Sequence, residues 1–393
     1  MMTTETKREP LIHISGRPAM RWGYALLWRL GAIVASILFC MLLSWLITGT
    51  NPIDFAVTVV HASFPDDPSL FAGRFWPMLH DLAILLMLSL AVTPAFRMRF
   101  WNIGAEGQTL AGCLAAGACM KLLTGVIPDV WVLPCEIIAA ILAGALWGVI
   151  PAVFKAWFGT NETLFTLMMN YIAAQLMAFF CVLWASPKGS GNVGIINPSG
   201  AARAVGWFPT KFEIFGVTIE NDYLINIAIA GVMVILLFFY MVKSKHGFEL
   251  SVVGESQRTA SYLGINVRWV TIRTMILSGG LCGLTGLMLT AGVNHTINST
   301  LAGGNGFTAV MVSWLAKFNP FLMILASFLV VFLRRGAKDL KSNANLNLDE
   351  SFSDILMGII LFFIIGCEFF IRYRIRFRHR ASAQPEKEVT SRA

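Results

Sequence analysis

The 393-residue sequence is poor in charge. Only 13% of its residues are Asp, Glu, Lys or Arg, whereas 56% are hydrophobic and the mean hydropathy is +0.68. Water-soluble globular domains carry about 25% charged residues, so this scarcity excludes one. Apolar runs of about 20 residues recur, and each is long enough to cross a bilayer as a helix. Because backbone groups cannot remain unpaired in lipid, these runs predict an all-α polytopic membrane protein.

Motifs of catalysis and of metal binding are also lacking. The seven cysteines show no CxxC or Cys/His ligand spacing and the six histidines are scattered, so we expect neither disulfides nor a metal site. No cluster of a nucleophile and a base stands out, and no G-x-x-x-x-G-K-[ST] phosphate-binding loop occurs. We therefore expect no catalytic residues, no ATP hydrolysis by this chain and no cofactor of its own.

Charge placement indicates topology. The net charge is +8, but the basic residues gather at the ends of apolar runs, which argues against nucleic-acid binding. With both termini in the cytoplasm, most Lys and Arg lie on the cytoplasmic side, as the positive-inside rule requires. We expect ten segments in two five-span halves: 28–47, 77–96, 103–123, 130–154, 163–184, 223–242, 270–292, 307–316, 320–333 and 352–371. The chain would then comprise a cytoplasmic segment (1–27), a transmembrane domain (28–371) and a basic cytoplasmic tail (372–393).

One basic cluster conflicts with this topology by falling outside: Arg334, Arg335, Lys338 and Lys341. A single crossing over 307–333 would bring the cluster inside, but it would expel the more basic tail, so we keep two short segments. Exterior loops are expected at 48–76 and 185–222, and the second is either a docking surface or an ordered connector. The interior loop 243–269 is polar enough to hold a surface helix.

Two glycine-rich stretches interrupt the apolar pattern, WNIGAEGQTLAG at 101–112 and AGGNGF at 302–307. If the chain has two five-span halves, both breaks follow the second span of a half. Paired breaks of this kind indicate a transport site, because half-helix termini and freed backbone groups face a cavity there. The alternative is a pair of capped turns at the membrane surface. The candidate path residues of these breaks are Asn102, Glu106, Gln108, Asn305 and Phe307.

A polar stripe follows at Glu162, Thr166 and Asn170, whose spacing of four places them on one helix face. Within a bilayer this face must contact protein or water. It is either part of a solute path or an interhelical hydrogen-bond seam. Asp81 and Glu136 also lie inside expected spans near an end, where we expect snorkelling to the interface rather than a proton relay.

Three motifs carry a resemblance to a known family: FWNIGAEGQTLAG, GALWGVIPAVFKAWFGTNETLFTLMMNYIA and KHGFELSVVGESQRTASYLGINV. In order and spacing they resemble the permease subunits of ABC importers of the branched-chain amino acid, ribose and simple-sugar type, closest to the nucleoside and simple-sugar branch. The likeness runs from about residue 76 to 371. The stretches SQRTASYLGI and SWLAKFNP depart from the family pattern, which weakens any inference of the exact substrate.

The resemblance implies a bacterial inner-membrane permease for a nucleoside, simple sugar or similar small polar solute. Its implied partners are a cytosolic ATP-binding subunit that holds the ATP, a second permease subunit or second copy, and an exterior substrate-binding lipoprotein or periplasmic protein. A nucleobase would also favour aromatics such as Phe307 and Trp314. The alternative is a secondary transporter driven by an ion gradient, with Asp81, Glu106, Glu136 or Glu162 as the coupling carboxylate.

The interior loop is where ATP-driven movement would enter a chain that has no phosphate-binding loop. Residues 256–263 can form about two helical turns, bounded by Gly254 and Gly264. Such a helix would fit a groove on the ATPase, with Tyr262 and Leu263 as apolar anchors and Glu255 and Arg258 at its polar edge. The expected coupling residues are Gly247, Glu255, Arg258, Tyr262, Leu263 and Gly264.

Overall fold

The computed structural model describes residues 12–17, 22–49, 51–190, 193–197, 205–214, 217–343 and 350–377. Helices account for most of this part of the chain, and its strands form two two-stranded sheets. The chain divides into two compact units: unit 1 comprises Met1–Phe55 and Leu348–Ala393, and unit 2 comprises Ala56–Asn347.

Unit 1 joins two long helices from opposite ends of the chain. The guanidinium of Arg29 pairs with the carboxylate of Glu368 at 2.5 Å between these helices. A short antiparallel sheet follows at their ends. The elements of unit 1 are β1 (Ile12–Gly16), α1 (Trp22–Thr48), α13 (Glu350–Arg372) and β4 (Tyr373–Phe377).

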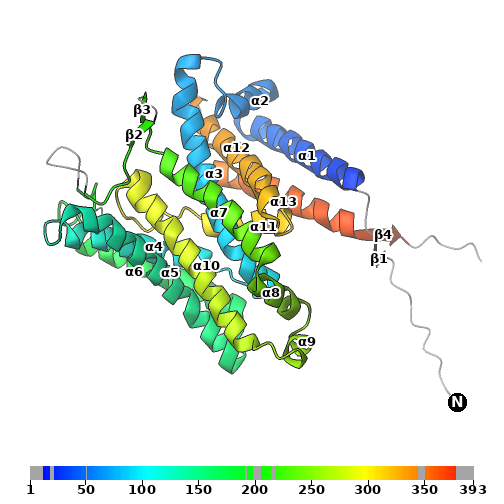
Figure 1. The fold of residues 1–393 in the computed structure, drawn as a ribbon. Helices are drawn as coiled ribbons and strands as arrows, with labels where there is room; N and C mark the ends of the chain where they lie inside the picture. The colour runs from blue at the N-terminus through cyan, green and yellow to red at the C-terminus, as the bar shows by residue number, and fades with distance from the viewer. Residues whose placement is uncertain are drawn as a thin grey trace, which may run out of the picture. The chain divides into compact units, whose positions relative to one another are not determined.

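Unit 2 is a helical bundle around one central helix, α10, which packs against α3, α4 and α5 (Figure 1). Its elements are most of α2 (Pro52–His61), α3 (Pro68–Arg97), α4 (Ala105–Leu123), α5 (Asp129–Phe158), α6 (Glu162–Leu183), β2 (Lys211–Ile214), β3 (Val217–Glu220), α7 (Leu224–Lys243), α8 (Lys245–Glu255), α9 (Gln257–Tyr262), α10 (Val267–Leu289), the π-helical turn η1 (Thr290–Asn294), α11 (Asn305–Leu315) and α12 (Pro320–Asn343).

Glycines allow the backbones around α10 to touch. A Cβ atom on Gly283 would lie 2.1 Å from the carbonyl oxygen of Ala140 in α5, and one on Gly279 would lie 2.3 Å from that of Gly144. On the α4 side, a Cβ on Gly286 would lie 2.4 Å from the carbonyl oxygen of Thr109. Small residues at helix crossings are typical of membrane bundles, where close packing replaces the hydrophobic effect between helices.

Every expected apolar segment lies on a helix, and the chain is an integral membrane protein. Seven helices among the described residues are long and apolar enough to cross a membrane: Leu27–Ile47, Pro68–Arg97, Asp129–Phe158, Glu162–Leu183, Leu224–Lys243, Val267–Asn294 and Pro320–Asp339. The expected segments on α4, α11 and α13 are not among these seven. Ten crossings with both termini in the cytoplasm therefore stay a prediction.

Two helices extend well beyond their expected segments. α3 begins at Pro68 rather than 77, because Asp67 caps it by accepting the Ser69 N–H at 2.9 Å and proline suits the first helical position. α12 is not the short segment expected at 320–333, and it continues to Asn343 through the basic cluster.

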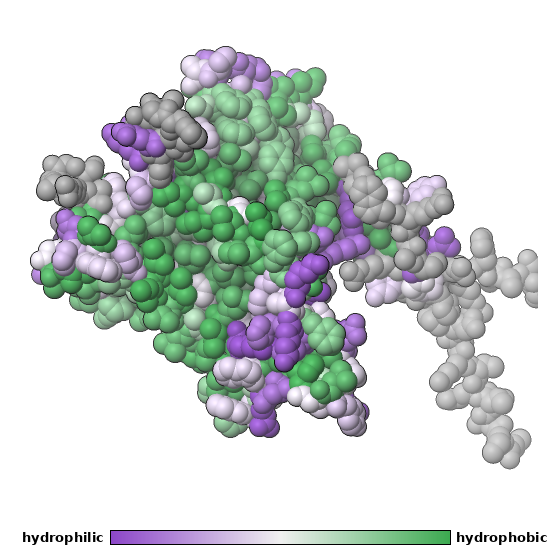
Figure 2. Space-filling model, in the orientation of Figure 1, coloured by the Kyte–Doolittle hydropathy of each residue, from purple (hydrophilic) through white to green (hydrophobic). Residues whose placement is uncertain are grey.

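The surface of unit 2 fits this membrane setting. Figure 2 shows a broad hydrophobic surface over its helices, with hydrophilic residues gathered near α8 and α9 at one end and near β2 and β3 at the other. Large apolar side chains of unit 2 such as Leu142, Leu146 and Ile172 are more than half exposed. A lipid environment would bury them.

The described parts of the loop between α6 and α7 are fastened to the bundle. Trp207 stacks on His295 with ring centroids 3.6 Å apart, and its indole N–H donates to the carbonyl of Ile196. The side-chain amide of Asn197 donates to the carbonyls of Met120 and Val205. These contacts favour the ordered-connector interpretation for residues 193–197 and 205–208.

Candidate functional site

The first glycine-rich break forms the turn between α3 and α4, and its polar side chains are bonded to one another. Asn102 and Gln108 exchange amide hydrogen bonds of 3.3 and 3.2 Å, and Asn102 also donates to the hydroxyl of Ser278 in α10 at 3.1 Å. The exposed fractions of Asn102 and Gln108 are 0% and 1%. In this conformation the pair stabilises the start of α4 from within the bundle.

The two breaks meet through one carboxylate. Glu106, in the first turn of α4, accepts the backbone N–H of Gly304 at 2.8 Å and that of Gly306 at 2.7 Å. Both donors lie at the N-terminus of α11, where unpaired N–H groups and the helix dipole favour an anion. A Cβ on Gly306 would lie 2.4 Å from the Glu106 nitrogen, so only glycine permits this approach.

The stripe on α6 fastens the first break from the other side. Asn170 accepts the N–H of Gly107 and donates to the carbonyl of Ile103, both at 2.9 Å. The hydroxyl of Thr166 accepts the N–H of Ile103 at 3.3 Å. Glu162 lies at the end of the stripe and pairs with Lys155 of α5 at 2.7 Å. This geometry favours the hydrogen-bond seam over the solute path for these three side chains.

The second break borders a cavity of about 400 Å³ that sequence reasoning did not anticipate. Its walls come from α3, the start of α7, η1, the loop before α11, and α12. Asn305 lines it, together with residues absent from the expected solute path: His80, Asp81, Tyr223, Asn294, Arg334, Arg335 and Lys338. Phe307 does not line the cavity.

The two arginines of the basic cluster that conflicts with the expected topology bond to other residues of unit 2. The guanidinium of Arg335 pairs with Asp81 at 2.7 Å. Arg334 donates to the carbonyl of Gly303 at 2.7 Å and to the side-chain oxygen of Asn305. The sequence already indicated that these arginines have local partners, because they conflict with the positive-inside rule and charged residues within membrane segments pair with nearby groups.

The two remaining carboxylates inside expected spans behave differently. Asp81 is partly exposed and pairs with Arg335. Glu136 is 0% exposed, and neither of its carboxyl oxygens has a hydrogen-bond partner among the described residues. The expectation that Glu136 snorkels to the interface is therefore wrong. The loop at Gly206 covers it, since a Cβ there would lie 2.2 Å from its Oε1 atom.

An aromatic cluster covers the turns at the other end of α11. Trp101 stacks on Trp314 with ring centroids 5.5 Å apart. Phe96 packs edge-on against both tryptophans, and Phe318 packs edge-on against Trp314. Trp101 is 45% exposed and Trp314 36% exposed, and Phe307 is 38% exposed on the same helix. Partial exposure is compatible with stacking on a flat ligand, but the role of Phe307 and Trp314 stays a prediction.

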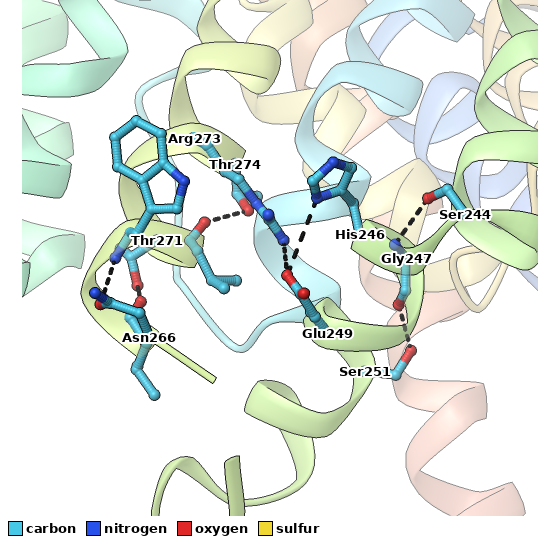
Figure 3. Close-up of polar contacts among 12 residues, drawn as sticks. Ser244, His246, Gly247, Glu249, Ser251, Asn266, Thr271, Arg273 and Thr274 are labelled. Atoms are coloured by element: carbon cyan, nitrogen blue, oxygen red, sulfur yellow. Dashed lines mark hydrogen bonds and ion pairs between the residues drawn. The ribbon is translucent and has the colours of Figure 1, made fainter. Parts of the chain in front are cut away.

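The interior loop holds two helices, α8 and α9, where one was expected. α8 is fixed to the bundle: Glu249 pairs with Arg273 of α10 and lies 4.0 Å from Nδ1 of His246 (Figure 3). The Gly247 N–H is capped by the Ser244 hydroxyl at 3.0 Å. Gly254, expected to bound the coupling helix, instead lies buried within α8, where a Cβ atom would be 2.1 Å from the carbonyl oxygen of Arg97.

α9 projects from this fixed base. Ser256 caps it by accepting the Thr259 N–H at 3.2 Å, and Gly264 follows it with a φ of +77°, a conformation that favours glycine. Only Ala260 within α9 is buried. The expected anchors are strongly exposed, Tyr262 at 91% and Leu263 at 63%, and Glu255 and Arg258 are exposed as well.

Comparison with known proteins places these features in a family. Residues 77–365 match the family described as branched-chain amino acid transport system / permease component. The chain is 31% identical over 300 residues to a guanosine ABC transporter permease protein of Bacillus subtilis (strain 168), covering 76% of this chain and 81% of that protein.

Two further relatives have the same kind of name. A glucose ABC transporter permease protein of Haloferax volcanii is 28% identical over 77% of this chain and 79% of its own length. A nucleoside ABC transporter permease protein of Lactococcus lactis subsp. cremoris is 26% identical over 73% and 77%. The matched region contains both glycine-rich breaks, the α6 stripe and the α8–α9 segment. The chain therefore belongs to the family of branched-chain amino acid transport system permease components.

Proposed function

We propose that this chain is the membrane-spanning permease of an ABC importer for a nucleoside or a simple sugar. It would act in the bacterial inner membrane, with ten crossings and both termini in the cytoplasm. ATP would be bound and hydrolysed by a separate cytosolic subunit. The assembly would also contain a second permease, homologous or identical, and an exterior substrate-binding lipoprotein or periplasmic protein. The names of three relatives, which transport guanosine, nucleosides or glucose, support this substrate class.

The observation that carries the proposal is the exposed tip formed by α9. A six-residue helix that leaves Tyr262 and Leu263 in solvent would bury little surface of its own, whereas α8 beneath it is tied to α10 by an ion pair. A rigid base and an exposed apolar tip are what a partner groove requires. We infer that the ATPase binds Tyr262 and Leu263, with Glu255 and Arg258 at the rim and Gly247 and Gly264 setting the backbone.

We further propose that Phe307 and Asn305 lie along the solute path, with Trp314 available to stack on a nucleobase. Their exposure and the meeting of the two breaks support this role. Asn102, Gln108, Thr166 and Asn170 would act by holding the breaks in position, since their polar atoms bond to protein. Glu106 and Glu162 would do the same through the Gly304 and Lys155 contacts.

The coupling role is tested with Leu263→Asp. A charge at an apolar interface anchor should weaken ATPase binding by about 2 kcal/mol, roughly thirtyfold. We expect loss of ATPase co-purification and of ATP-driven uptake in proteoliposomes, with an unchanged unfolding temperature because the side chain is exposed. The matched control is Gln257→Asp, which places the same charge on the other end of α9 and should leave both measurements near wild type.

Uptake by the purified complex, with a panel of nucleosides and sugars, tests the transport function directly. ATP-dependent uptake of a nucleoside or a simple sugar is the expected result. Uptake that persists without ATP and collapses with an ionophore would contradict the proposal and favour an ion-gradient transporter. A Leu263→Asp complex that keeps its ATPase would contradict the coupling assignment alone.

A further inference from the structure

The cavity beside the second glycine-rich break has an excess of positive charge. One wall of the cavity is formed by α12 and carries Arg334, Arg335 and, one turn later, Lys338. Among the described residues that line the cavity, Asp81 is the one that carries a carboxylate. The Asp81 carboxylate already forms an ion pair with Arg335, with Oδ2 and Nη2 2.7 Å apart. Ionisable side chains of membrane helices pair with one another or with backbone carbonyls, so a cation that has neither partner indicates a further ligand.

The two other cations do not find an equivalent partner. The guanidinium of Arg334 bonds to two neutral oxygens, one on Gly303 and one on Asn305, and also attracts the Glu106 carboxylate behind them. Lys338 is exposed at the cavity and has no ion pair with any described residue. Even with Glu106 counted, one cationic side chain is left without a carboxylate.

A buried histidine provides a second, independent sign of a ligand. His80 lines the cavity with an exposed fraction of 6%. Its Nδ1 atom lies 3.6 Å from Asp81, whereas its Nε2 atom is buried with no hydrogen-bond partner among the described residues. Buried polar atoms are nearly always hydrogen-bonded, so an unpartnered Nε2 on a residue that lines the cavity indicates a missing partner. Tyr223 fixes the ring, with centroids 5.6 Å apart.

We propose that this cavity binds the carboxylate or phosphate group of a small molecule. Lys338 supplies the free charge, Arg334 and Arg335 add to the positive field, and His80 hydrogen-bonds the ligand through Nε2. Charge-assisted hydrogen bonds to phosphate or carboxylate oxygens are about twice as strong as neutral ones. The apolar wall, which includes Ile84, Leu289 and Val331, receives the uncharged remainder of the ligand. The proposal does not rest on the transport function.

Calorimetric titration of the full chain in phosphatidylcholine nanodiscs tests the proposal. The probes are uridine 5′-monophosphate and uridine, which differ only in the phosphate group. We expect the monophosphate to bind at least tenfold more tightly than uridine. Lys338→Gln should lower its affinity about tenfold, because one charge-assisted contact is lost. His80→Phe, which keeps an aromatic ring but removes both nitrogens, should also weaken it.

Lys121→Gln is the matched control, since Lys121 is an exposed lysine on α4 that does not line the cavity. Equal affinity for uridine and its monophosphate, or equal effects of Lys338→Gln and Lys121→Gln, would overturn the proposal. Nanodiscs containing phosphatidylglycerol distinguish the two sources of a phosphate group. Loss of nucleotide binding there assigns the cavity to a lipid headgroup, and retained binding assigns it to a soluble solute.

Discussion

Two glutamates inside the bundle of unit 2 differ in how the fold treats a carboxyl group. Glu106 accepts two backbone N–H groups at 2.7 and 2.8 Å from the start of α11. Glu136 is completely buried in α5, and neither of its oxygens has a partner among the described residues. The two side chains share a chemistry and a membrane setting, but only the first is bonded.

This difference indicates that Glu106 connects two segments of the chain, whereas Glu136 only packs within the bundle. A carboxylate group suits the α11 N-terminus, because the helix dipole and two N–H donors compensate part of its lost hydration. The carboxyl group of Glu136 has no such compensation from any described residue. We therefore expect Glu106 to join the two breaks electrostatically, whereas Glu136 fills space beneath the loop at Gly206.

The largest effect is expected for Glu106→Gln. The amide retains one acceptor oxygen, but its NH₂ group must face a backbone N–H of α11. Losing a charge-assisted bond and leaving that donor buried should cost about 3 kcal/mol. Thermal unfolding of the purified chain measures the loss, and uptake by the assembled complex should fall with it. A variant with wild-type stability would show that the two breaks do not depend on this carboxylate.

A smaller effect is expected for Gly306→Ala. The added methyl group would lie 2.4 Å from the backbone nitrogen of Glu106 and 2.7 Å from its Cα, so α11 must move away from α4. Overpacking of this kind costs about 1–3 kcal/mol. Gly231→Ala is the control, since a Cβ there meets nothing within 4 Å. Equal unfolding temperatures for the two variants would contradict the close approach.

Much of this fold could be predicted from the sequence. Hydropathy located a helix for each expected segment, because a membrane span must satisfy its backbone internally whatever its neighbours are. The glycine-rich breaks and the helix at 256–263 were also found, since glycine and capping residues act locally. Gly264 follows α9 as its chemistry predicts, whereas the expected first boundary, Gly254, lies inside α8 and Ser256 caps the helix instead.

Which residues contact each other across the fold could not be predicted in the same way. Glu106 and Gly304 are 198 positions apart, and no local pattern says that they meet. For the same reason α12 was expected to stop before Arg334, whose partners Gly303 and Asn305 become neighbours only after folding. The cavity beside α12 was missed with them, because it is made by five separate segments.

The smallest effect is expected at Glu136, and it sharpens the comparison most. Glu136→Gln, the same substitution as at Glu106, should change the unfolding free energy by no more than about 1 kcal/mol, because no hydrogen bond to a described residue is lost. Glu136→Met should be as stable as the wild type or slightly more stable, since replacing a buried unpaired polar group by an apolar one of similar shape is nearly neutral. Uptake should also be unchanged in both. A large loss of uptake without loss of stability would mean that the Glu136 carboxyl takes part in transport, as the ion-gradient alternative requires.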